Sequence, residues 1–306
     1  MDNYYVDLNH RELLVVSGID SERFLQGQLS CDLSAISELD SCPGCLCDNK
    51  GRVIASFTLW KITEVFYLEM EAGVADFAEQ HLKKYSVFYK TKIAIKNEVF
   101  NRIGLIGSEA QAYLIKHFAK IPSQANQIEA SDGNYLRLAD PVNLRFELWQ
   151  DSTSPLSVQS KTDLDLAEGK LEDWRLLDQS IGLYRLQSEA SALYTPQELN
   201  YDQLGHISFT KGCYTGQEIV ARMHYRGKAK KRLYLLEISA ESSPEKNMLI
   251  RTVENKPVGE IIDVAVLAKN KYQVLAIATE SIKQALKVQN LNNSELTLIP
   301  SILLNE

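Results

Sequence analysis

The stretch Lys211-Gly-Cys-Tyr-Thr-Gly-Gln-Glu218 places one cysteine between two glycines, directly before a segment with helical character. Glycine lets a backbone turn tightly or approach a ligand closely. The lysine at position 211 would favour the thiolate of Cys213, which is the reactive form of a thiol. Residues 216–223 contain no proline and can begin a helix, whose N-terminus would favour the thiolate as well. A cysteine in such a turn is also commonly a small buried hydrophobe, so both interpretations stay open.

A basic run follows this motif directly and consists of Arg222, Arg226, Lys228, Lys230, Lys231 and Arg232. Such runs are most often solvated surface, although they can also contact phosphate groups. The chain as a whole is acidic, with 40 Asp and Glu residues against 33 Lys and Arg residues and a net charge of −7. The overall charge therefore does not favour a nucleic-acid-binding protein, whereas the local charge leaves that function open.

Length and composition are those of an ordinary globular protein. The 306 residues, 45% of them hydrophobic, are enough for two or three domains with a sizeable core. Residues 1–6 hold no basic signal-peptide region, and no stretch reaches the ~18 apolar residues of a membrane helix. The five cysteines form no regular even framework, so we expect reduced thiols in a cytoplasmic protein that has no membrane partner.

Cys42, Cys45 and Cys47 lie close together in the segment 39–51, whose composition predicts a loop. A structural zinc site normally has four ligands. The sequence offers neither a second Cys-x-x-Cys pair nor a matching pair of histidines. We therefore expect no metal at this loop.

The order of the apolar patterns predicts an α+β N-terminal region. Strand and helix patterns alternate as β-α-β-β-α-β, which is typical of a ferredoxin-like unit. The expected strands are 11–16, 53–59, 65–70, 87–89 and 91–95, and the expected helices are 20–29 and 74–85. A second such passage has strands at 102–107, 134–138 and 144–149 and a helix at 108–118.

A polar segment, 151–162, separates this region from a predicted helix at 164–181 that carries Trp174. Residues 182–205 form a long irregular connection, which in a compact domain is usually functional or disordered. Short strand patterns separated by turns then follow, and they predict a small C-terminal β-barrel. These strands are expected at 233–238, 248–253, 256–266, 272–278 and 296–304.

The motif at 211–218 resembles the signature of the YgfZ family, folate-binding proteins linked to tRNA modification and related to the glycine-cleavage T-protein, an aminomethyltransferase. Other segments match the family in the same order: Phe24-Leu-Gln-Gly-Gln-Leu29, Cys47-Asp-Asn-Lys-Gly51, Leu82-Lys-Lys-Tyr-Ser-Val-Phe88, Thr195-Pro-Gln-Glu-Leu-Asn200 and Ile207-Ser-Phe209. The resemblance implies a folate-binding α+β body at 1–230, made of two ferredoxin-like units plus the motif connection. It implies a C-terminal β-barrel domain at 231–306 and a central channel that takes a folate.

The resemblance also implies roles for individual residues. Cys213 matches the cysteine tied to iron–sulfur-dependent tRNA thiolation, and Trp174 matches a tryptophan that contacts folate. Arg11 and Ser180 stand where relatives carry a second folate-contacting tryptophan and a glutamate on the pterin, which weakens the inference of folate binding. The other candidate positions are Arg226 and Lys228, for the glutamate tail of tetrahydrofolate or a derivative, and the motif residues Lys211, Gly212, Tyr214, Gly216, Gln217 and Glu218.

The T-protein has a catalytic aspartate after a glycine turn, and Ala55 and Ser56 occupy the matching places here. Without a carboxylate, no group at this place can assist proton transfer. The leading hypothesis is therefore a folate-binding accessory factor for iron–sulfur enzymes or assembly factors that supports tRNA thiomethylation, and not a classical enzyme. The alternatives are a folate-dependent one-carbon transferase and a direct tRNA-binding module. We expect an indirect link to tRNA and expect Cys213 alone, among the five cysteines, to be required.

Overall fold

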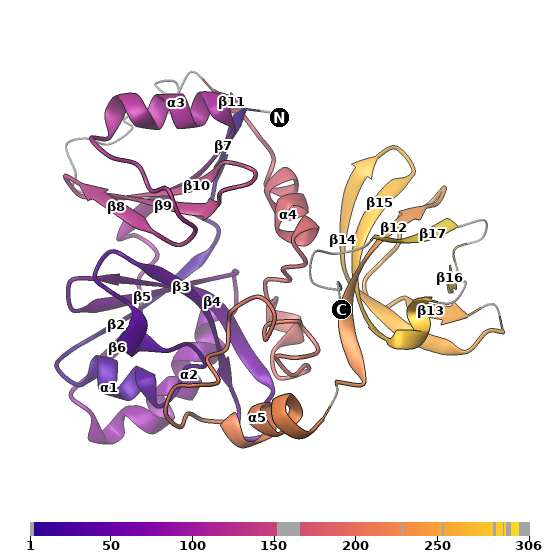
Figure 1. Cartoon of the computed structure of the whole chain (residues 1–306), viewed down its shortest axis with the longest axis horizontal. Coiled ribbons are helices and arrows are strands. Elements are labelled where there is room, and N and C mark those ends of the chain that lie inside the picture. The colour runs from indigo at the N-terminus through magenta and orange to yellow at the C-terminus, as the bar shows by residue number, and fades with distance from the viewer. Residues whose placement is uncertain are drawn as a thin grey trace.

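The computed structural model describes residues 3–151, 166–227, 229–252, 254–283, 286–289, 291 and 295–299. Figure 1 shows an N-terminal body of two sheets and, beside it, a C-terminal sheet, with helix α4 (Leu171–Ser180) between them. None of the described helices is long and apolar enough to cross a membrane.

The first sheet of the body has the strand order of a ferredoxin-like unit with one additional edge strand. The order is β3-β4-β5-β2-β6, and all neighbouring strands are antiparallel. The helices α1 and α2 pack on the face turned away from the second sheet (Figure 1). The elements are β2 (Glu12–Ser17), α1 (Ser21–Gln26), β3 (Ser41–Cys47), β4 (Val53–Ile62), β5 (Val65–Met70), α2 (Ala75–Tyr85) and β6 (Lys92–Ile95).

The second sheet has the order β11-β1-β7-β10-β9-β8. The place of the fourth ferredoxin-like strand is taken by β1 from the start of the chain, which pairs antiparallel with β7, Tyr4 opposite Ile106. This unit is therefore not continuous in the sequence, contrary to the two consecutive passages that the sequence suggested. Its elements are β1 (Tyr4–Asp7), β7 (Phe100–Ile106), α3 (Ser108–His117), β8 (Ile128–Ser131), β9 (Asn134–Asp140), β10 (Arg145–Asp151) and β11 (Ala167–Glu168).

The two sheets of the body share a core of large aromatic side chains. Trp60 on β4 stacks on Trp149 on β10, with 3.9 Å between ring centroids, and both are fully buried. Phe100 packs beside them, 5.3 Å from the Trp149 ring. Aromatic pairs of this kind stabilise a core beyond the area that they bury. The body is thus one packed unit, and its two sheets hold a fixed relative position.

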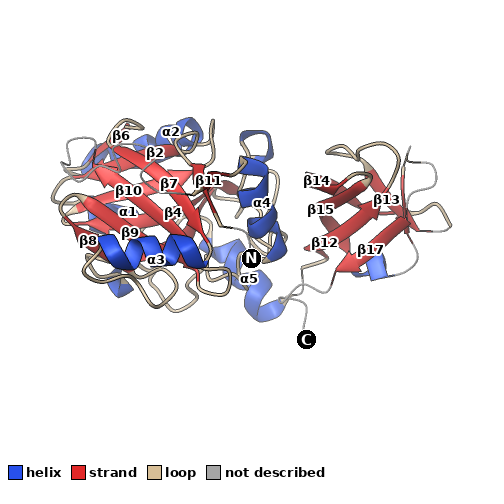
Figure 2. Cartoon of the chain, turned by 90° about the horizontal axis from the view of Figure 1, so that it is seen from above, coloured by secondary structure: helices blue, strands red, loops and turns tan. Residues whose placement is uncertain are grey.

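The C-terminal sheet is antiparallel, has the order β16-β13-β14-β15-β12-β17 and curls into a half-barrel (Figures 1 and 2). One face encloses an apolar core of its own. The other face shares a core with the 184–207 segment, β3 and α5 (Gln217–Arg226), so the sheet is attached to the body by buried apolar contacts. Its strands are β12 (Lys231–Ser239), β13 (Leu249–Thr252), β14 (Pro257–Ala268), β15 (Lys271–Thr279), β16 (Leu286–Val288) and β17 (Glu295–Ile299).

The structure corrects several local expectations. Residues 41–47, predicted as part of a loop, form strand β3, and Pro43 is accommodated because β3 is an edge strand. The strand expected at 87–89 is a short 3₁₀ helix, η2 (Ser86–Phe88). The polar segment from residue 152 onward, and the start of the helix predicted at 164–181, lie outside the described residues. Within the described part of that prediction, residues 167–168 form strand β11, and helix α4 begins only at Leu171. The remaining 3₁₀ helices are η1 (Leu33–Ala35), η4 (Ser188–Ala190) and η5 (Glu280–Lys283).

Candidate functional site

The side chain of Lys211 anchors the signature motif to the body. Its Nζ donates hydrogen bonds to the carbonyl oxygens of Leu29 (2.6 Å) and Cys31 (2.7 Å), just after α1. The ammonium also lies 5.3 Å from the centroid of the Tyr214 ring, and burial lowers the pKa of Lys211. The sequence suggested that this charge would act on Cys213. The structure instead directs it to backbone carbonyls inside the body.

Gly216 directly precedes helix α5, and its φ of +84° lies in the left-handed region that favours glycine. A methyl group placed on Gly216 would overlap the carbonyl oxygen of Asp48 and lie 3.3 Å from the Cα of Gly51. The start of α5 therefore rests directly on the turn between β3 and β4. The two most specific sequence matches, 211–218 and 47–51, are thus brought together as one structural unit.

Cys213 is exposed, whereas the other four cysteines are buried or partly buried. Its neighbour Gly212 faces open space, since a methyl group there would meet no atom within 4 Å. On the other side, Tyr214 is buried and its N–H donates to Oε1 of Gln217 (3.2 Å), while Glu218 is exposed in the first turn of α5. The thiol is therefore displayed on a short loop that is fixed at both ends.

The chain that leads into the motif is fixed to the body as well. Ser208 N–H donates to the carbonyl of Ser30 (2.9 Å), and the hydroxyl of Ser30 donates to the carbonyl of His206 (2.6 Å). His206 is buried and stacks on Tyr201, with ring centroids 4.4 Å apart. Burial lowers the pKa of His206 to about 3, so this imidazole is neutral at physiological pH.

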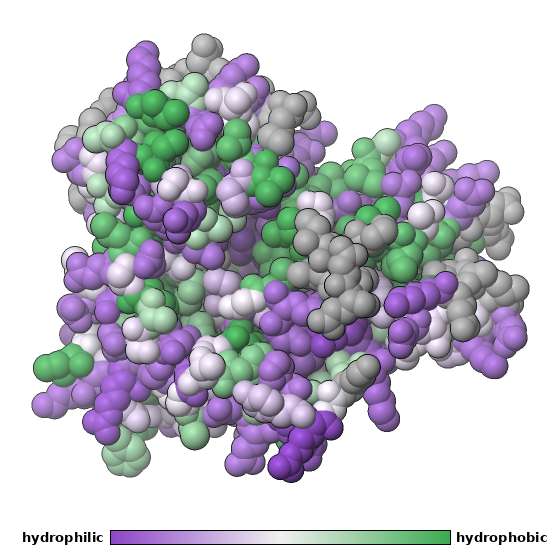
Figure 3. Space-filling model, viewed as in Figure 1, coloured by the Kyte–Doolittle hydropathy of each residue, from purple (hydrophilic) through white to green (hydrophobic). Residues whose placement is uncertain are grey.

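The outer face of α5 carries exposed basic and aromatic side chains close to the motif. His224 stacks on Phe209, with centroids 3.6 Å apart, and the neighbouring Tyr225 is 67% exposed. Arg222 and Arg226 are exposed on the same helix, and Figure 3 shows hydrophilic side chains gathered over it.

The basic run continues beyond α5, and its residues differ in exposure and in pairing. Lys228, proposed for a glutamate tail, lies outside the described residues. Lys230 and Lys231 are exposed, whereas Arg232 forms a bidentate salt bridge with Asp202. Its Nη1 and Nη2 donate to the two carboxylate oxygens of Asp202 at 2.7 and 3.0 Å. Arg232 therefore serves the attachment of β12 to the body and is not available to a ligand.

Trp174 on α4 has no exposed surface. The Arg145 guanidinium lies over its ring, 4.3 Å from the centroid, and the ring edge packs against Gly104 with no space for a side chain there. Its Nε1 has no hydrogen-bond partner among the described residues. In this conformation Trp174 packs within the protein, and the predicted contact of its ring with a folate requires a rearrangement that exposes it.

A buried network of arginines and carboxylates lies beneath α4. Arg11, the residue in place of a predicted aromatic folate contact, is 1% exposed, and its Nη1 lies 3.2 Å from Glu69 and 3.1 Å from Glu147. Burial alone would raise the pKa of Glu147, but the surrounding guanidinium groups outweigh it and hold the pKa at about 2. The members are Arg11, Arg137, Arg145, Arg185, Glu69, Glu71, Glu147 and Asp178.

Sequence reasoning missed this network apart from Arg11. A signal was present, because Glu69 stands in an otherwise apolar strand and Glu147 stands between the apolar residues Phe146 and Leu148. A charged residue at such a position is normally paired when it is buried. The sequence alone could not identify the partners, because the network combines residues of three strands and one helix with residues of the segments between such elements.

The space between α4, β14 and the 183–187 segment is too small for a folate in this conformation. The cavity there measures about 10 Å³, which is room for about one water molecule. Its polar groups are already paired, since Asp263 accepts from Arg175 (2.8 Å) and Gln179 (2.9 Å), and Asp178 accepts from Arg185 (2.9 Å). The residues present therefore do not form an open pterin pocket.

The position that would carry the T-protein carboxylate is uncharged. Ala55 on β4 is fully buried, and the Ser56 hydroxyl accepts a hydrogen bond from the Leu186 N–H (3.0 Å). Within the part of the chain that the structure describes, no group of three or more His, Cys, Asp or Glu side chains is arranged to hold a metal ion. Cys42, Cys45 and Cys47 lie in strand β3.

Comparison with known proteins bears on both the fold and the family. The chain is 32% identical over 240 residues to the tRNA-modifying protein YgfZ of Colwellia psychrerythraea (strain 34H), a match that covers 78% of this chain and 73% of that relative. The crystal structure of the glycine cleavage system aminomethyltransferase T from Bartonella henselae superposes with a TM-score of 0.78, at 15% identity, over 98% of this chain and 86% of that one. No family model matches the sequence.

Proposed function

Because the chain belongs to the YgfZ family, we propose that it supports tRNA modification and that Cys213 is its functional thiol. The observation that carries this proposal is the exposure of Cys213 on an ordered loop. The thiol is exposed on a loop that is fixed by Lys211 on one side and by the contact of Gly216 with the β3–β4 turn on the other. An ordered but accessible thiol suits a transient covalent, redox or cluster-contacting step.

The proposed role is that of a cytoplasmic accessory factor for iron–sulfur enzymes or their assembly factors, including those that thiomethylate tRNA. A single exposed thiol is too few ligands for stable metal storage, which normally needs four. It can contact a cluster or a sulfur centre of a partner and then release it. The uncharged Ala55 and the engaged Ser56 hydroxyl argue against the alternative, a one-carbon transferase that resembles the aminomethyltransferase.

A deletion strain of a host that carries a relative of this protein provides the test. Expression of this chain should restore the thiomethylated tRNA that the deletion lowers, and Cys213→Ser should fail to restore it while accumulating to the same level. Serine keeps the shape and removes the soft nucleophile, and position 213 is exposed, so folding should be intact. Full restoration by Cys213→Ser would overturn the assignment of the thiol.

Tetrahydrofolate or a derivative is proposed as a ligand on the basis of family membership and the shared fold. The cavity of about 10 Å³ beneath α4 adds a condition, because a folate can enter only when α4 and the 183–187 segment separate from β14. Titration of a reduced folate while tryptophan fluorescence is followed tests this proposal, with Trp174→Phe as the comparison. The absence of a saturable change up to millimolar ligand would remove folate from the proposal.

A second candidate function is direct tRNA binding by the outer face of α5. The observation in its favour is the grouping of exposed Arg222 and Arg226 with exposed Tyr225, close to the motif loop. Cations that contact phosphates and aromatic rings that stack on bases are the usual means of contacting single-stranded RNA. The acidic charge of the whole chain, −7, argues for a small footprint confined to this face.

A further inference from the structure

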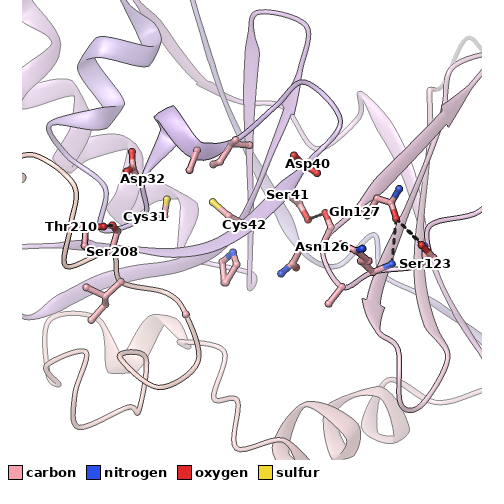
Figure 4. Close-up of a pocket in the computed structure, with 17 residues that line it drawn as sticks. Cys31, Asp32, Asp40, Ser41, Cys42, Ser123, Asn126, Gln127, Ser208 and Thr210 are labelled. Atoms are coloured by element: carbon pink, nitrogen blue, oxygen red, sulfur yellow. Dashed lines mark hydrogen bonds between the residues drawn. The ribbon is translucent and has the colours of Figure 1, made fainter.

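A pocket of about 670 Å³ opens on the side of the body where the two sheets meet (Figure 4). Three segments line it: the end of α1 through β3, the 123–127 segment that precedes β8, and residues 205–210 that lead into the motif. An isolated bridge between Asp40 and Gln127 holds the two sheets together at its edge. The volume is in the range of small-molecule sites. Nothing in the proposed function uses this pocket.

Two cysteines meet in the pocket wall. Cys31 follows α1, and Cys42 lies near the start of β3. The sulfur atoms of the two residues face one another in Figure 4. Cys31 is 4% exposed and Cys42 is partly exposed, so a reagent in the pocket reaches the pair from one side. Both cysteines line the same pocket although they are 11 positions apart in the sequence, and thiol–disulfide exchange requires two thiols that can reach the same disulfide.

The surroundings make the two thiols unequal. The ammonium of Lys211 donates to the carbonyl of Cys31 (2.7 Å) and lies on the Cys31 side of the pair. The hydrogen bond from Cys42 is the main cause that lowers the pKa of Cys31, and Lys211 adds to it against the effect of burial. The same hydrogen bond, together with burial, raises the pKa of Cys42. One acidic thiol beside one less acidic thiol is the arrangement of a nucleophile and its resolving partner.

We propose that Cys31 and Cys42 form a redox-active dithiol that exchanges with a small polar disulfide bound in this pocket. The Cys31 thiolate attacks one sulfur of the disulfide RS–SR, forming a mixed disulfide and releasing RS⁻. The Cys42 thiol passes its proton to the released RS⁻ and attacks the sulfur of Cys31, forming the Cys31–Cys42 disulfide and releasing the second RS⁻. The small disulfide is reduced to two thiols while the protein dithiol is oxidised, so the electrons balance.

The pocket lining indicates the kind of disulfide. Seven of the 17 lining residues carry a hydroxyl or an amide, and two carry carboxylates, Asp32 and Asp40. Hydrogen bonds from Ser34 and Gln26 lower the pKa of Asp32, so this group is ionised near neutrality. These groups fit a polar disulfide that carries ammonium groups better than one that carries only carboxylates.

The chain supplies its own control pair. Cys45 and Cys47 on β3 have sulfur atoms 3.9 Å apart, also within reach of one another, but both are fully buried and neither lines the pocket. If proximity alone decided oxidation, this pair would react as readily as Cys31 and Cys42. If the pocket and Lys211 decide it, only Cys31 and Cys42 should react in the folded protein.

The test uses the full chain with Cys213→Ser, because the exposed thiol would otherwise react first. Glutathione disulfide is added in increasing ratio to glutathione, free thiols are blocked at acid pH, and the disulfides are mapped by peptide mass spectrometry. The expected product is a Cys31–Cys42 disulfide with Cys45 and Cys47 still reduced. A Cys45–Cys47 disulfide that forms first, or no Cys31–Cys42 disulfide at a large excess of oxidant, would overturn the proposal.

Single substitutions on the same background separate the two roles. Cys42→Ser should retain one glutathione on Cys31, whereas Cys31→Ser should take up glutathione at Cys42 at least about tenfold more slowly. Equal rates would contradict the assignment of Cys31 as nucleophile. The ligand class is tested with the protein in which Cys31 and Cys42 are both present. The rate at which this pair is oxidised is measured with cystamine, which carries two ammonium groups, and with dithiodipropionate, which carries two carboxylates. Cystamine should react faster, and faster reaction of the dianion would overturn the assigned ligand class.

Discussion

Gly216 and Gly51 pack backbone against backbone. A methyl group built on Gly216 would lie 3.3 Å from the Cα of Gly51, and one built on Gly51 would lie 3.5 Å from the carbonyl oxygen of Gly216. Both glycines have positive φ, +84° and +71°. The position of Cys213 therefore depends on the absence of a side chain at two places that are far apart in the sequence.

Gly216→Ala is expected to destabilise the protein by about 1–3 kcal/mol, because alanine is strained at positive φ and its methyl group would overlap the carbonyl of Asp48. The measurement is urea unfolding. Gly212→Ala is the matched control in the same motif, since that position faces open space, and its stability should stay within about 0.5 kcal/mol of the parent. Equal losses in the two variants would contradict the close contact.

Arg11→Met should destabilise the protein by about 3–5 kcal/mol, because it leaves two buried carboxylates without their shared cation. Glu69→Gln in the same chain should recover part of the loss, since burial already raises the pKa of Glu69 and favours its neutral form. A double-mutant cycle by urea unfolding measures the coupling. Additive effects would show that Arg11 and Glu69 act independently. Lys271→Met, at an exposed pair with Glu237, is the control.

His206 should make the free energy of unfolding depend on pH between pH 7 and pH 5, above the range in which ordinary carboxylates titrate. Its pKa in the folded protein is about 3, below the value of 6.5 in the unfolded chain. A depressed pKa contributes stability that is fully present above pH 6.5 and is lost as pH falls towards 3. Between pH 7 and pH 5 the loss should be about 2 kcal/mol. His206→Phe, which keeps the stack on Tyr201, should flatten this part of the profile.

The control for this pH profile is His117→Phe, because His117 also stacks on a tyrosine, Tyr113, but is exposed. That variant should leave the slope between pH 7 and pH 5 unchanged. A slope that is the same in the parent and in His206→Phe would mean that His206 is not the group that titrates.

The class of fold could be predicted because its signals are local. Alternating apolar residues defined most strands, and the helices at 75–85 and 108–117 showed helical spacing. The role of β1 could not be predicted, since pairing of Tyr4 with Ile106 depends on contacts between distant parts of the chain. Strand β3 was missed because glycine and proline are depleted in strands, and only its position at the sheet edge makes Pro43 acceptable.

The part of the candidate site that could be predicted is also the part whose signals are local in the sequence. Glycines and a cysteine in one short motif indicate a special turn, and the structure places Gly216 in one. The direction of Lys211 was not predictable, because its acceptors, Leu29 and Cys31, are about 180 positions away. Likewise, the sequence alone gave no reason to pair Cys31 with Cys42. The two residues come together only because the chain turns back after residue 31 and enters β3.

The basic face of α5 provides a test of direct tRNA binding. Replacing both Arg222 and Arg226 with glutamine should weaken any tRNA binding at least about tenfold and reduce its dependence on salt, because each phosphate contact contributes to that dependence. The measurement is a salt series of binding titrations. Lys256→Gln together with Lys271→Gln, two exposed lysines of the C-terminal sheet, is the charge-matched control. Similar effects from both pairs would indicate binding without a defined site.

The clamp between α4 and β14 should limit folate binding. Asp263 on β14 holds Arg175 (2.8 Å) and Gln179 (2.9 Å) of α4, and the cavity behind them has room for about one water molecule. A ligand that needs the open form binds more weakly in proportion to the rarity of that form. Arg175→Ala removes one contact of the clamp, so the Kd for a reduced folate, followed by tryptophan fluorescence, should fall severalfold. Lys246→Ala is the control, because it breaks a more exposed pair outside the clamp, between the β12–β13 connection and Glu189 of η4, and it should leave the Kd unchanged. Weaker binding in Arg175→Ala would mean that this arginine contacts the ligand and does not restrain the opening.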